Sequence, residues 1–310
     1  MKVLVTCPPM LRLIEEFKPQ FEEKGIELIA PNVVQTLSED ELTELVPQVE
    51  GWIIGDDPAT ERVFTAGKQG KLKAAVKWGV GVDNVDFKAC EKLGIPVTNT
   101  PQMFGHEVGA LAVQYVLALA RDSYFIDREV RKGNWPKPAG ISLEGRTAAV
   151  IGFGDIGKHT AKYLRPFGLN VIVYDPFAKP NEVEQQQFSF KNYPDDIEKA
   201  DFLVVTCALN ESTYHMVNEE VLSKMKDAVR IVNVSRGPVI DEKALIFALE
   251  SGKVYAAALD VFEEEPLPLS SPLRNFEKCI LGTHNGSNTV DAVRRASKEA
   301  IRKLFQFLEV

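Results

Sequence analysis

The sequence lacks the features that mark a nucleic-acid-binding or membrane protein. It has 36 Lys and Arg against 44 Asp and Glu, a formal net charge of −8, and no basic stripe that would follow a phosphate backbone. Its most apolar stretch, Val108 to Ala120, is interrupted by Gln114 and is shorter than the ~20 residues that cross a bilayer. We therefore expect neither a nucleic-acid partner nor a membrane anchor.

Cysteine and histidine are also scarce. The four cysteines, Cys7, Cys90, Cys207 and Cys279, lie far apart without a CxxC pair, and the four histidines are not clustered. Neither a disulfide framework nor a metal site is expected from this spacing. The amino-terminal run MKVLVTCPP is too short for a secretory signal and resembles a first strand. These observations predict a cytoplasmic protein with reduced thiols and no metal.

Short β-branched segments alternate with amphipathic stretches along nearly the whole chain. The predicted strands are KVLVT, GIELIA, GWIIG, KAAVKW, IPVTNT, TAAVIG, NVIVYD, DFLVVTC, VRIVNVS, YAAALDV and CILGTH. A strand followed by a helix, repeated many times, predicts parallel sheets with crossover helices. The length of 310 residues is sufficient for more than one core, so we expect two α/β domains.

The division between the domains is predicted near residue 100, where a strand ends and a long helix begins. The last helix, from Thr289 to Leu308, has a start that resembles a cap by Asn288, and we expect it to return to the first domain. The prediction is a first domain of residues 1–100 with 287–310. The second domain, residues 101–286, is then inserted into the first.

The middle of the chain carries a dinucleotide-binding pattern, TAAVIGFGDIGKHTAKYLRPFGLNVIVYD. Its GxGxxG lies between a predicted strand and a predicted helix, where glycines let the backbone approach a pyrophosphate at the helix amino terminus. The residues predicted at this contact are Gly152, Gly154, Asp155, Ile156 and Gly157. Asp175 ends the next strand, where a carboxylate accepts hydrogen bonds from the adenosine ribose and repels a 2′-phosphate. The pattern predicts NAD as the cofactor, in preference to NADP.

Together with this pattern, motifs spread over almost the whole chain resemble the D-isomer-specific 2-hydroxyacid dehydrogenase family. The motifs are GVGVDNVD (79–86), NTP (99–101), GFGDIG (152–157), VNVSRGPVIDEKAL (232–245), LDVFEEEP (259–266) and THNGSNT (283–289). The resemblance implies two Rossmann-like doubly wound domains, with the NAD-binding domain inserted into a flavodoxin-like substrate domain. It also implies reversible hydride transfer between nicotinamide and C2 of a D-2-hydroxy acid.

The same resemblance implies three catalytic residues, Arg236, Glu265 and His284. The planar donors of a guanidinium match a carboxylate at two points, so Arg236 is expected to hold the substrate carboxylate and the 2-oxo oxygen. His284 is expected to exchange the hydroxyl proton, and Glu265 to orient its ring and favour the imidazolium. Each residue follows an apolar strand, and ligands gather outside the carboxyl ends of parallel strands. We therefore expect the three side chains to converge.

Further contacts with cofactor and substrate are implied in the same way. The residues implied to line the cofactor are Asp260 at the carboxamide, Val234 on the nicotinamide side and Cys207 on the adenosine side. Glycines 79 and 81 are expected to expose the N–H groups of Val80 and Gly81 to a substrate carboxylate. Lys77 adds a positive charge that would suit a phosphorylated substrate or one with a second acid group, and an exposed lysine with a structural role is the alternative.

Several questions stay open at this stage. The apolar helix of residues 108–120 requires cover on more than one side, which favours a homodimer with Trp135 in an arm, although burial within its own domain is the alternative. The expected ligand is a small 2-hydroxy or 2-oxo acid, of the phosphoglycerate, glycerate/hydroxypyruvate or glyoxylate type, and no additional regulatory domain is expected within these 310 residues. A non-enzymatic NAD-sensing protein of the corepressor type is one alternative function. A related dehydrogenase of a substrate such as phosphite is the other.

Overall fold

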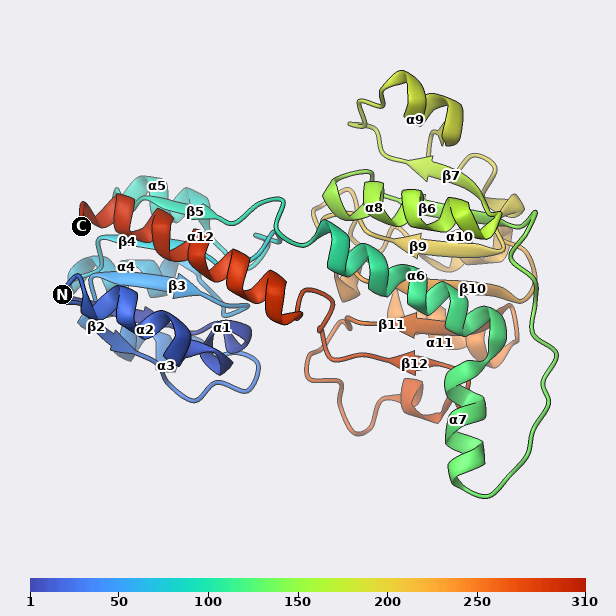
Figure 1. Ribbon diagram of the computed structural model, residues 1–310, viewed down its shortest axis with the longest axis horizontal. Coiled ribbons are helices and arrows are strands. Elements are labelled where there is room, and N and C mark those ends of the chain that lie inside the picture. Colours follow the sequence, from blue (N-terminus) through green and yellow to red (C-terminus); the bar gives the residue numbers. More distant parts are fainter. The chain divides into compact units, whose positions relative to one another are not determined.

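The computed structural model describes residues 1–310, and the chain forms two compact units (Figure 1). Unit 1 consists of Met1–Met103 and Asn288–Val310, and unit 2 of Phe104–Ser287. Each unit contains one parallel sheet with helices, so the predicted α/β class is confirmed. The division of roles between a substrate domain and an NAD-binding domain stays a prediction. None of the helices is at once long and apolar enough to cross a bilayer.

Unit 1 is built on a five-stranded sheet with the order β2-β1-β3-β4-β5. Its strands are β1 (Lys2–Val5), β2 (Glu27–Ile29), β3 (Gly51–Ile54), β4 (Ala74–Lys77) and β5 (Val97–Asn99). Its helices are α1 (Pro8–Arg12), α2 (Ile14–Glu22), α3 (Glu39–Leu45), η1 (Val46–Gln48), α4 (Glu61–Gln69), α5 (Phe87–Leu93) and α12 (Val290–Leu308). This strand order is that of flavodoxin-like doubly wound sheets, as predicted.

The last helix, α12, packs against β3 and β4 of unit 1 (Figure 1). Its buried residues recur at helical spacing, which gives it one apolar face. The side chain of Thr289, whose backbone is extended, accepts a hydrogen bond from the N–H of Ala292 at 3.2 Å. Thr289 is therefore the N-cap, and the predicted cap at Asn288 is wrong by one residue.

Unit 2 is built on a seven-stranded sheet with the order β12-β11-β10-β9-β6-β7-β8. Its strands are β6 (Thr147–Ile151), β7 (Asn170–Tyr174), β8 (Ser189–Lys191), β9 (Phe202–Val205), β10 (Val229–Asn233), β11 (Val254–Leu259) and β12 (Ile280–Leu281). Its helices are α6 (Gly105–Arg121), α7 (Ser123–Arg131), α8 (Asp155–Leu164), η2 (Arg165–Phe167), α9 (Glu182–Gln187), η3 (Ile197–Lys199), α10 (Glu219–Lys224), η4 (Gly237–Val239), α11 (Glu242–Glu250) and η5 (Pro272–Asn275).

The strand order of unit 2 determines where ligands bind. From β6 the chain adds β7 and β8 in order on one side of β6. It then returns to pair β9 with the opposite side of β6. The carboxyl ends of β6 and β9 therefore form a topological switch point, which is where dinucleotides bind in sheets of this type. Strands β10, β11 and β12 are parallel neighbours, so the segments that follow them leave the sheet at the same edge.

Helix α6 contains the apolar segment of residues 108–120. It packs against α8 and against β10 and β11 of its own unit, and about half of its residues are buried there. Ala110 and Gln114 are exposed. Helix α6 is thus largely buried within its own unit, and dimerisation through it stays a prediction.

Candidate active site

A glycine-rich turn joins β6 to α8 at the switch point of unit 2. A Cβ on Gly157 would lie 2.0 Å from the carbonyl oxygen of Gly152, so only glycine allows this close packing of turn and helix. A Cβ on Gly154 would meet no atom within 4 Å, so open space lies beside the amino terminus of the ten-residue α8. The first turn of α8, with Asp155 and Ile156, has N–H groups without intrahelical partners. The turn thus fits the pyrophosphate of NAD.

The carboxylate of Asp175 lies next to this turn, directly after β7. Its Oδ2 accepts a hydrogen bond from the N–H of Phe153 at 2.7 Å, and its Oδ1 accepts one from the N–H of Phe177 at 2.8 Å. Each carboxylate oxygen has two acceptor positions, so both oxygens retain capacity for a ligand hydroxyl. The fixed position beside the glycine turn is the one that a ribose-binding carboxylate requires.

Two apolar side chains follow the strands on the other side of the switch point. Cys207, after β9, lies against the glycine turn, because a Cβ on Gly152 would lie 2.7 Å from the Cα of Cys207. Burial raises the pKa of Cys207 to about 12, so its thiol stays protonated and contributes a wall of the site. Val234, after β10, is 6% exposed and donates its N–H to the carbonyl oxygen of Val205 at 3.2 Å.

The predicted catalytic residues follow three neighbouring parallel strands of unit 2. Arg236 lies after β10, Glu265 after β11 and His284 after β12. His284 and Glu265 meet, with 2.8 Å between Nδ1 of the imidazole and Oε2 of the carboxylate, and each side chain is 21% exposed. The Oε1 atom of Glu265 accepts a hydrogen bond from the N–H of Phe262 at 3.0 Å. The carboxylate is therefore fixed through both oxygens while it holds the ring.

His284 has a backbone conformation that non-glycine residues rarely adopt. Its φ is 53°, in the left-handed region, where a non-glycine residue costs roughly 1 kcal/mol or more. The N–H of His284 donates to the carbonyl oxygen of Asp260 at 2.6 Å, which stabilises this turn. Such strained positions concentrate at functional sites, where the surrounding contacts impose them.

Asp260 is buried and connects the end of β11 with the segment that carries His284. Its Oδ2 accepts the N–H of Gly286 at 2.8 Å, and the hydroxyl of Tyr115 lies 3.5 Å from Oδ1. Burial raises the pKa of Asp260, and hydrogen bonds from the N–H groups of Asn285 and Gly286 oppose the rise. Asp260 therefore stabilises the turn that carries His284, and the predicted contact with the nicotinamide carboxamide stays a prediction.

The turn that carries Arg236 is held by Asn233, a residue that the sequence reasoning missed. Asn233 is 1% exposed, and its amide donates to the carbonyl oxygen of Arg236 at 2.9 Å. Its Oδ1 accepts hydrogen bonds from the N–H and the hydroxyl of Ser235. The signal in the sequence is a lone amide side chain at the carboxyl end of an apolar strand, in VNVS.

A close backbone contact joins the segments of Arg236 and Glu265. Nη1 of Arg236 donates to the carbonyl oxygen of Ser235 at 2.9 Å. A Cβ on the following residue, Gly237, would lie 1.9 Å from the carbonyl carbon of Phe262. Only glycine allows this approach, so the two segments are in contact through their backbones.

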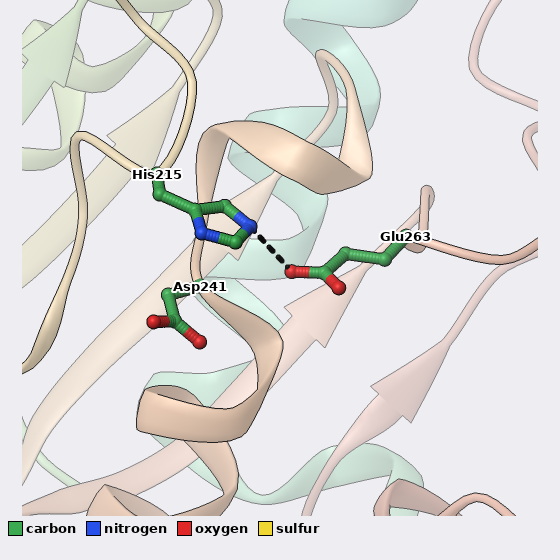
Figure 2. A group of neighbouring side chains, drawn as sticks. All are labelled: His215, Asp241 and Glu263. Atoms are coloured by element: carbon green, nitrogen blue, oxygen red, sulfur yellow. Dashed lines mark hydrogen bonds and ion pairs between the residues drawn. The ribbon is translucent and has the colours of Figure 1, made fainter.

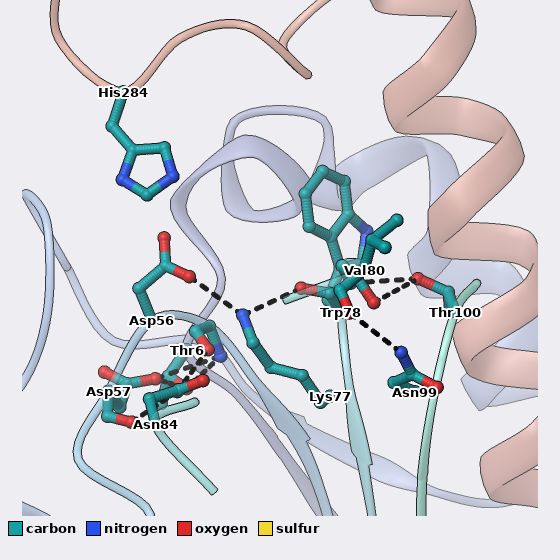
Figure 3. A network of polar contacts seen from close by, with 12 residues as sticks. Thr6, Asp56, Asp57, Lys77, Trp78, Val80, Asn84, Asn99, Thr100 and His284 are labelled. Atoms are coloured by element: carbon teal, nitrogen blue, oxygen red, sulfur yellow. Dashed lines mark hydrogen bonds and ion pairs between the residues drawn. The ribbon is translucent and has the colours of Figure 1, made fainter. Parts of the chain in front are cut away.

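Unit 1 contains the predicted substrate residue Lys77 at the end of β4. Lys77 is 2% exposed, and its Nζ donates to Oδ1 of Asp56 at 2.8 Å and to the carbonyl oxygen of Trp78 at 3.1 Å (Figure 3). The alternative of an exposed lysine is therefore wrong. Lys77 can be buried because the carboxylate of Asp56, which follows β3, compensates the charge of its ammonium.

Two hydrogen bonds hold the glycine-containing segment after Lys77 within unit 1. The N–H of Gly79 donates to Oγ1 of Thr100 at 2.9 Å, and the carbonyl oxygen of Val80 accepts from the amide of Asn99 at 3.1 Å. The N–H groups of Val80 and Gly81 donate to no acceptor within unit 1. These two groups are available to a carboxylate, and their role in binding one stays a prediction.

A doubly wound sheet with a dinucleotide turn, a His–Glu pair and a neighbouring arginine defines a nicotinamide-dependent dehydrogenase. The family model described as D-isomer specific 2-hydroxyacid dehydrogenase, NAD binding domain, matches residues 113–286. The chain is 37% identical over 279 residues to hydroxypyruvate reductase from Thermotoga maritima, covering 88% of this chain and 90% of that protein. It is 36% identical over 314 residues to D-3-phosphoglycerate dehydrogenase from Methanocaldococcus jannaschii, covering 98% of this chain but 57% of that protein.

The crystal structure of the TT0316 protein from Thermus thermophilus has the same fold, with a TM-score of 0.88 and 29% identity, covering 100% of this chain and 97% of that chain. The chain belongs to the D-isomer specific 2-hydroxyacid dehydrogenase family. It is an NAD-dependent oxidoreductase of 2-hydroxy acids and acts on CH–OH donors, so the predicted family, activity class and cofactor are confirmed.

Proposed function

We propose that Arg236, Glu265 and His284 carry out the reaction on a D-2-hydroxy acid. NAD, when bound at the glycine turn, would supply the nicotinamide ring as the acceptor of the hydride from C2. His284 takes the hydroxyl proton as the hydride leaves and returns a proton to the oxygen in the reverse direction. The observation that carries this proposal is the 2.8 Å contact between Nδ1 of His284 and Oε2 of Glu265, and in the proposal Nε2 exchanges the proton. Glu265 then stabilises the imidazolium that forms.

Arg236 binds the carboxylate and the 2-oxo oxygen of the substrate in this proposal. During oxidation, negative charge develops on the oxygen before the proton has fully moved, and a fixed guanidinium stabilises it. Asn233 acts as a positioning residue, because its amide holds the backbone of Arg236. Within unit 1, the N–H groups of Val80 and Gly81 are proposed as donors to a substrate carboxylate.

The proposed cofactor contacts lie in the segments that follow the strands at and beside the switch point of unit 2. The proposed pyrophosphate contacts are Gly152, Gly154, Asp155, Ile156 and Gly157, with Asp175 at the ribose. Cys207 lines the adenosine side, Val234 the nicotinamide side, and Asp260 holds the carboxamide. Support comes from the open space beside Gly154 and from the fixed carboxylate of Asp175.

The preferred substrate in this proposal is a small 2-oxo acid without a phosphate group, such as hydroxypyruvate or glyoxylate. A phosphate is bound most strongly by cations whose charge is not already compensated. Lys77 was the cation expected to bind it, and its ammonium is buried against Asp56. Lys77 therefore supports the backbone of residues 78–81, and a phosphate gains little from it.

Oxidation of NADH with a panel of 2-oxo acids tests this function. The panel contains hydroxypyruvate, glyoxylate, 3-phosphohydroxypyruvate, pyruvate and 2-oxoglutarate, and kcat/KM is compared across it. We expect hydroxypyruvate or glyoxylate to be reduced fastest. Faster reduction of 3-phosphohydroxypyruvate would contradict the proposed substrate class but not the proposed reaction. Turnover of none of the five, or reduction of NAD by phosphite alone, would contradict the proposed reaction and favour the NAD-sensing or phosphite alternative.

Asp175→Ala is expected to lower the preference for NADH over NADPH by about tenfold or more. The substitution removes a charged acceptor for the ribose hydroxyls, worth about 1.5 kcal/mol or more, and the repulsion of a 2′-phosphate. The measurement is the ratio of kcat/KM for the two cofactors. Asp227→Ala, which removes the 92% exposed carboxylate paired with Lys253, serves as the control and should keep the wild-type ratio. An unchanged ratio in Asp175→Ala would remove Asp175 from the ribose site.

We also propose that the protein is a cytoplasmic homodimer. Helix α7 has no buried residue, and apolar side chains on it and after it are exposed, among them Tyr124, Val130 and the 79% exposed Trp135. A second copy of the chain that covered these side chains would remove apolar surface from water. The four cysteines form no disulfide, which agrees with a reducing compartment.

A further inference from the structure

Three side chains of metal-ligand type meet in unit 2 outside the residues assigned above (Figure 2). His215 lies between β9 and α10, Asp241 is the N-cap of α11, and Glu263 lies in the segment after β11. One ligand atom from each residue lies within 4.8 Å of the other two. We propose that His215, Asp241 and Glu263 bind a divalent transition-metal ion, with Zn²⁺ as the representative ion.

The donor set suits a borderline ion rather than Mg²⁺ or Ca²⁺. One imidazole nitrogen and two carboxylate oxygens are common zinc ligands, whereas Mg²⁺ and Ca²⁺ prefer oxygen alone. Three protein ligands leave one tetrahedral position for water. The three residues come from three separate segments of the chain, so a bound ion cross-links these segments.

The geometry requires only small side-chain movements. Zn–N and Zn–O bonds of about 2.0–2.2 Å place two ligands of a tetrahedral ion about 3.4 Å apart. Nε2 of His215 is 2.8 Å from Oε1 of Glu263, so these atoms would separate slightly, while the Asp241 oxygen, which lies within 4.8 Å of both, would move closer. The ring of Tyr214 stacks on that of His215 with 4.0 Å between centroids, which orients the imidazole before an ion arrives.

The charge around the group favours a cation. Glu242 and Glu264 adjoin Asp241 and Glu263 in the sequence, so two further carboxylates lie on the segments that carry the proposed ligands. A divalent ion bound here would reduce the repulsion between these negative charges.

The ion would stabilise the segments that carry two of the proposed catalytic residues. Glu263 precedes Glu265 in the same loop, and Asp241 follows Arg236 through the short helix η4. These segments already exchange hydrogen bonds, since the N–H of Glu242 donates to Glu263 at 3.0 Å and the N–H of Glu263 donates to Glu242 at 3.3 Å. The ion adds His215 to this connection.

Calorimetric titration of the EDTA-treated full chain with ZnCl2, and separately with MgCl2, tests the site. We expect His215→Ala and Glu263→Gln each to weaken zinc binding by about 10-fold or more, as removal of even an outer-sphere partner does. MgCl2 should give no binding that depends on His215. Thermal unfolding provides a second readout, because an ion that binds only the folded state raises Tm with its concentration in the wild type.

His106→Ala is the matched control, because His106 is an exposed histidine of the same unit, on α6. It should bind zinc as the wild type does. Absence of zinc binding by the wild type, equal affinity in wild type and His215→Ala, or loss of binding in His106→Ala instead would each overturn the site. Circular dichroism establishes that the variants fold, and Glu263→Gln provides the comparison if His215→Ala does not.

Discussion

Arg236→Lys is expected to lower the turnover of the 2-oxo acid by about 100-fold or more, with little change in the affinity for NADH. Lysine keeps the positive charge but replaces the planar two-point fork with a single ammonium. The carboxylate and the 2-oxo oxygen then cannot both be bound in the same geometry. Because Asn233 holds the backbone of residue 236, the turn itself should persist in the variant.

The experiment measures kcat for the best substrate of the panel together with the Kd for NADH. Arg131→Lys is the matched control, since Arg131 is an exposed arginine of unit 2 that pairs only with Asp127. It should retain wild-type turnover. Near-normal turnover in Arg236→Lys would remove the proposed carboxylate anchor, whereas an equal loss in NADH affinity would indicate a disturbed fold.

Glu265→Gln is expected to move the pH profiles of both reaction directions toward acid, by about one unit or more. A carboxylate at 2.8 Å favours the imidazolium of His284, and glutamine keeps the shape while it removes the charge. Without that charge, His284 gives up its proton at lower pH. Reduction needs the imidazolium, so reduction falls about tenfold for each pH unit above its new midpoint, while oxidation extends further into acid.

Initial rates of both directions between about pH 5 and 9, a range that brackets the titration of histidine, test this expectation. Glu264→Gln is the control, because it removes a neighbouring exposed carboxylate from the same loop. Its profiles should coincide with those of the wild type. Wild-type midpoints in Glu265→Gln would show that His284 works without Glu265, and a shift in one direction only would contradict a shared proton donor and acceptor.

The parallel sheets followed from the sequence because their strands are continuous apolar runs. Strand β8, Ser189–Lys191, was missed: it has three residues, lies at the sheet edge, and pairs only with β7. Its sequence, SFK, has one apolar residue and no β-branched residue. An edge strand of this kind is specified by the neighbouring strand rather than by its own composition.

The catalytic residues were predicted from sequence motifs. That they lie at the same edge of the sheet was predicted from the parallel strand topology. The sequence did not predict the burial of Lys77, because the compensating Asp56 lies 21 residues away, in the segment after a different strand. The same limit applies to the group of His215 and Glu263, separated by 48 residues. Spacing along the chain predicted no metal there, since ligand spacing rules detect only ligands that are near in sequence.

The contact between Gly237 and the carbonyl carbon of Phe262 determines how this enzyme should be modified by directed evolution. Any side chain at position 237 would place its Cβ 1.9 Å from that backbone atom, so a library that varies this position consists mostly of misfolded variants. The contact between the segments of Arg236 and Glu265 therefore limits variation at position 237. Libraries for bulkier substrates should instead vary Val80 and Val82, which are 36% and 38% exposed and tolerate new side chains.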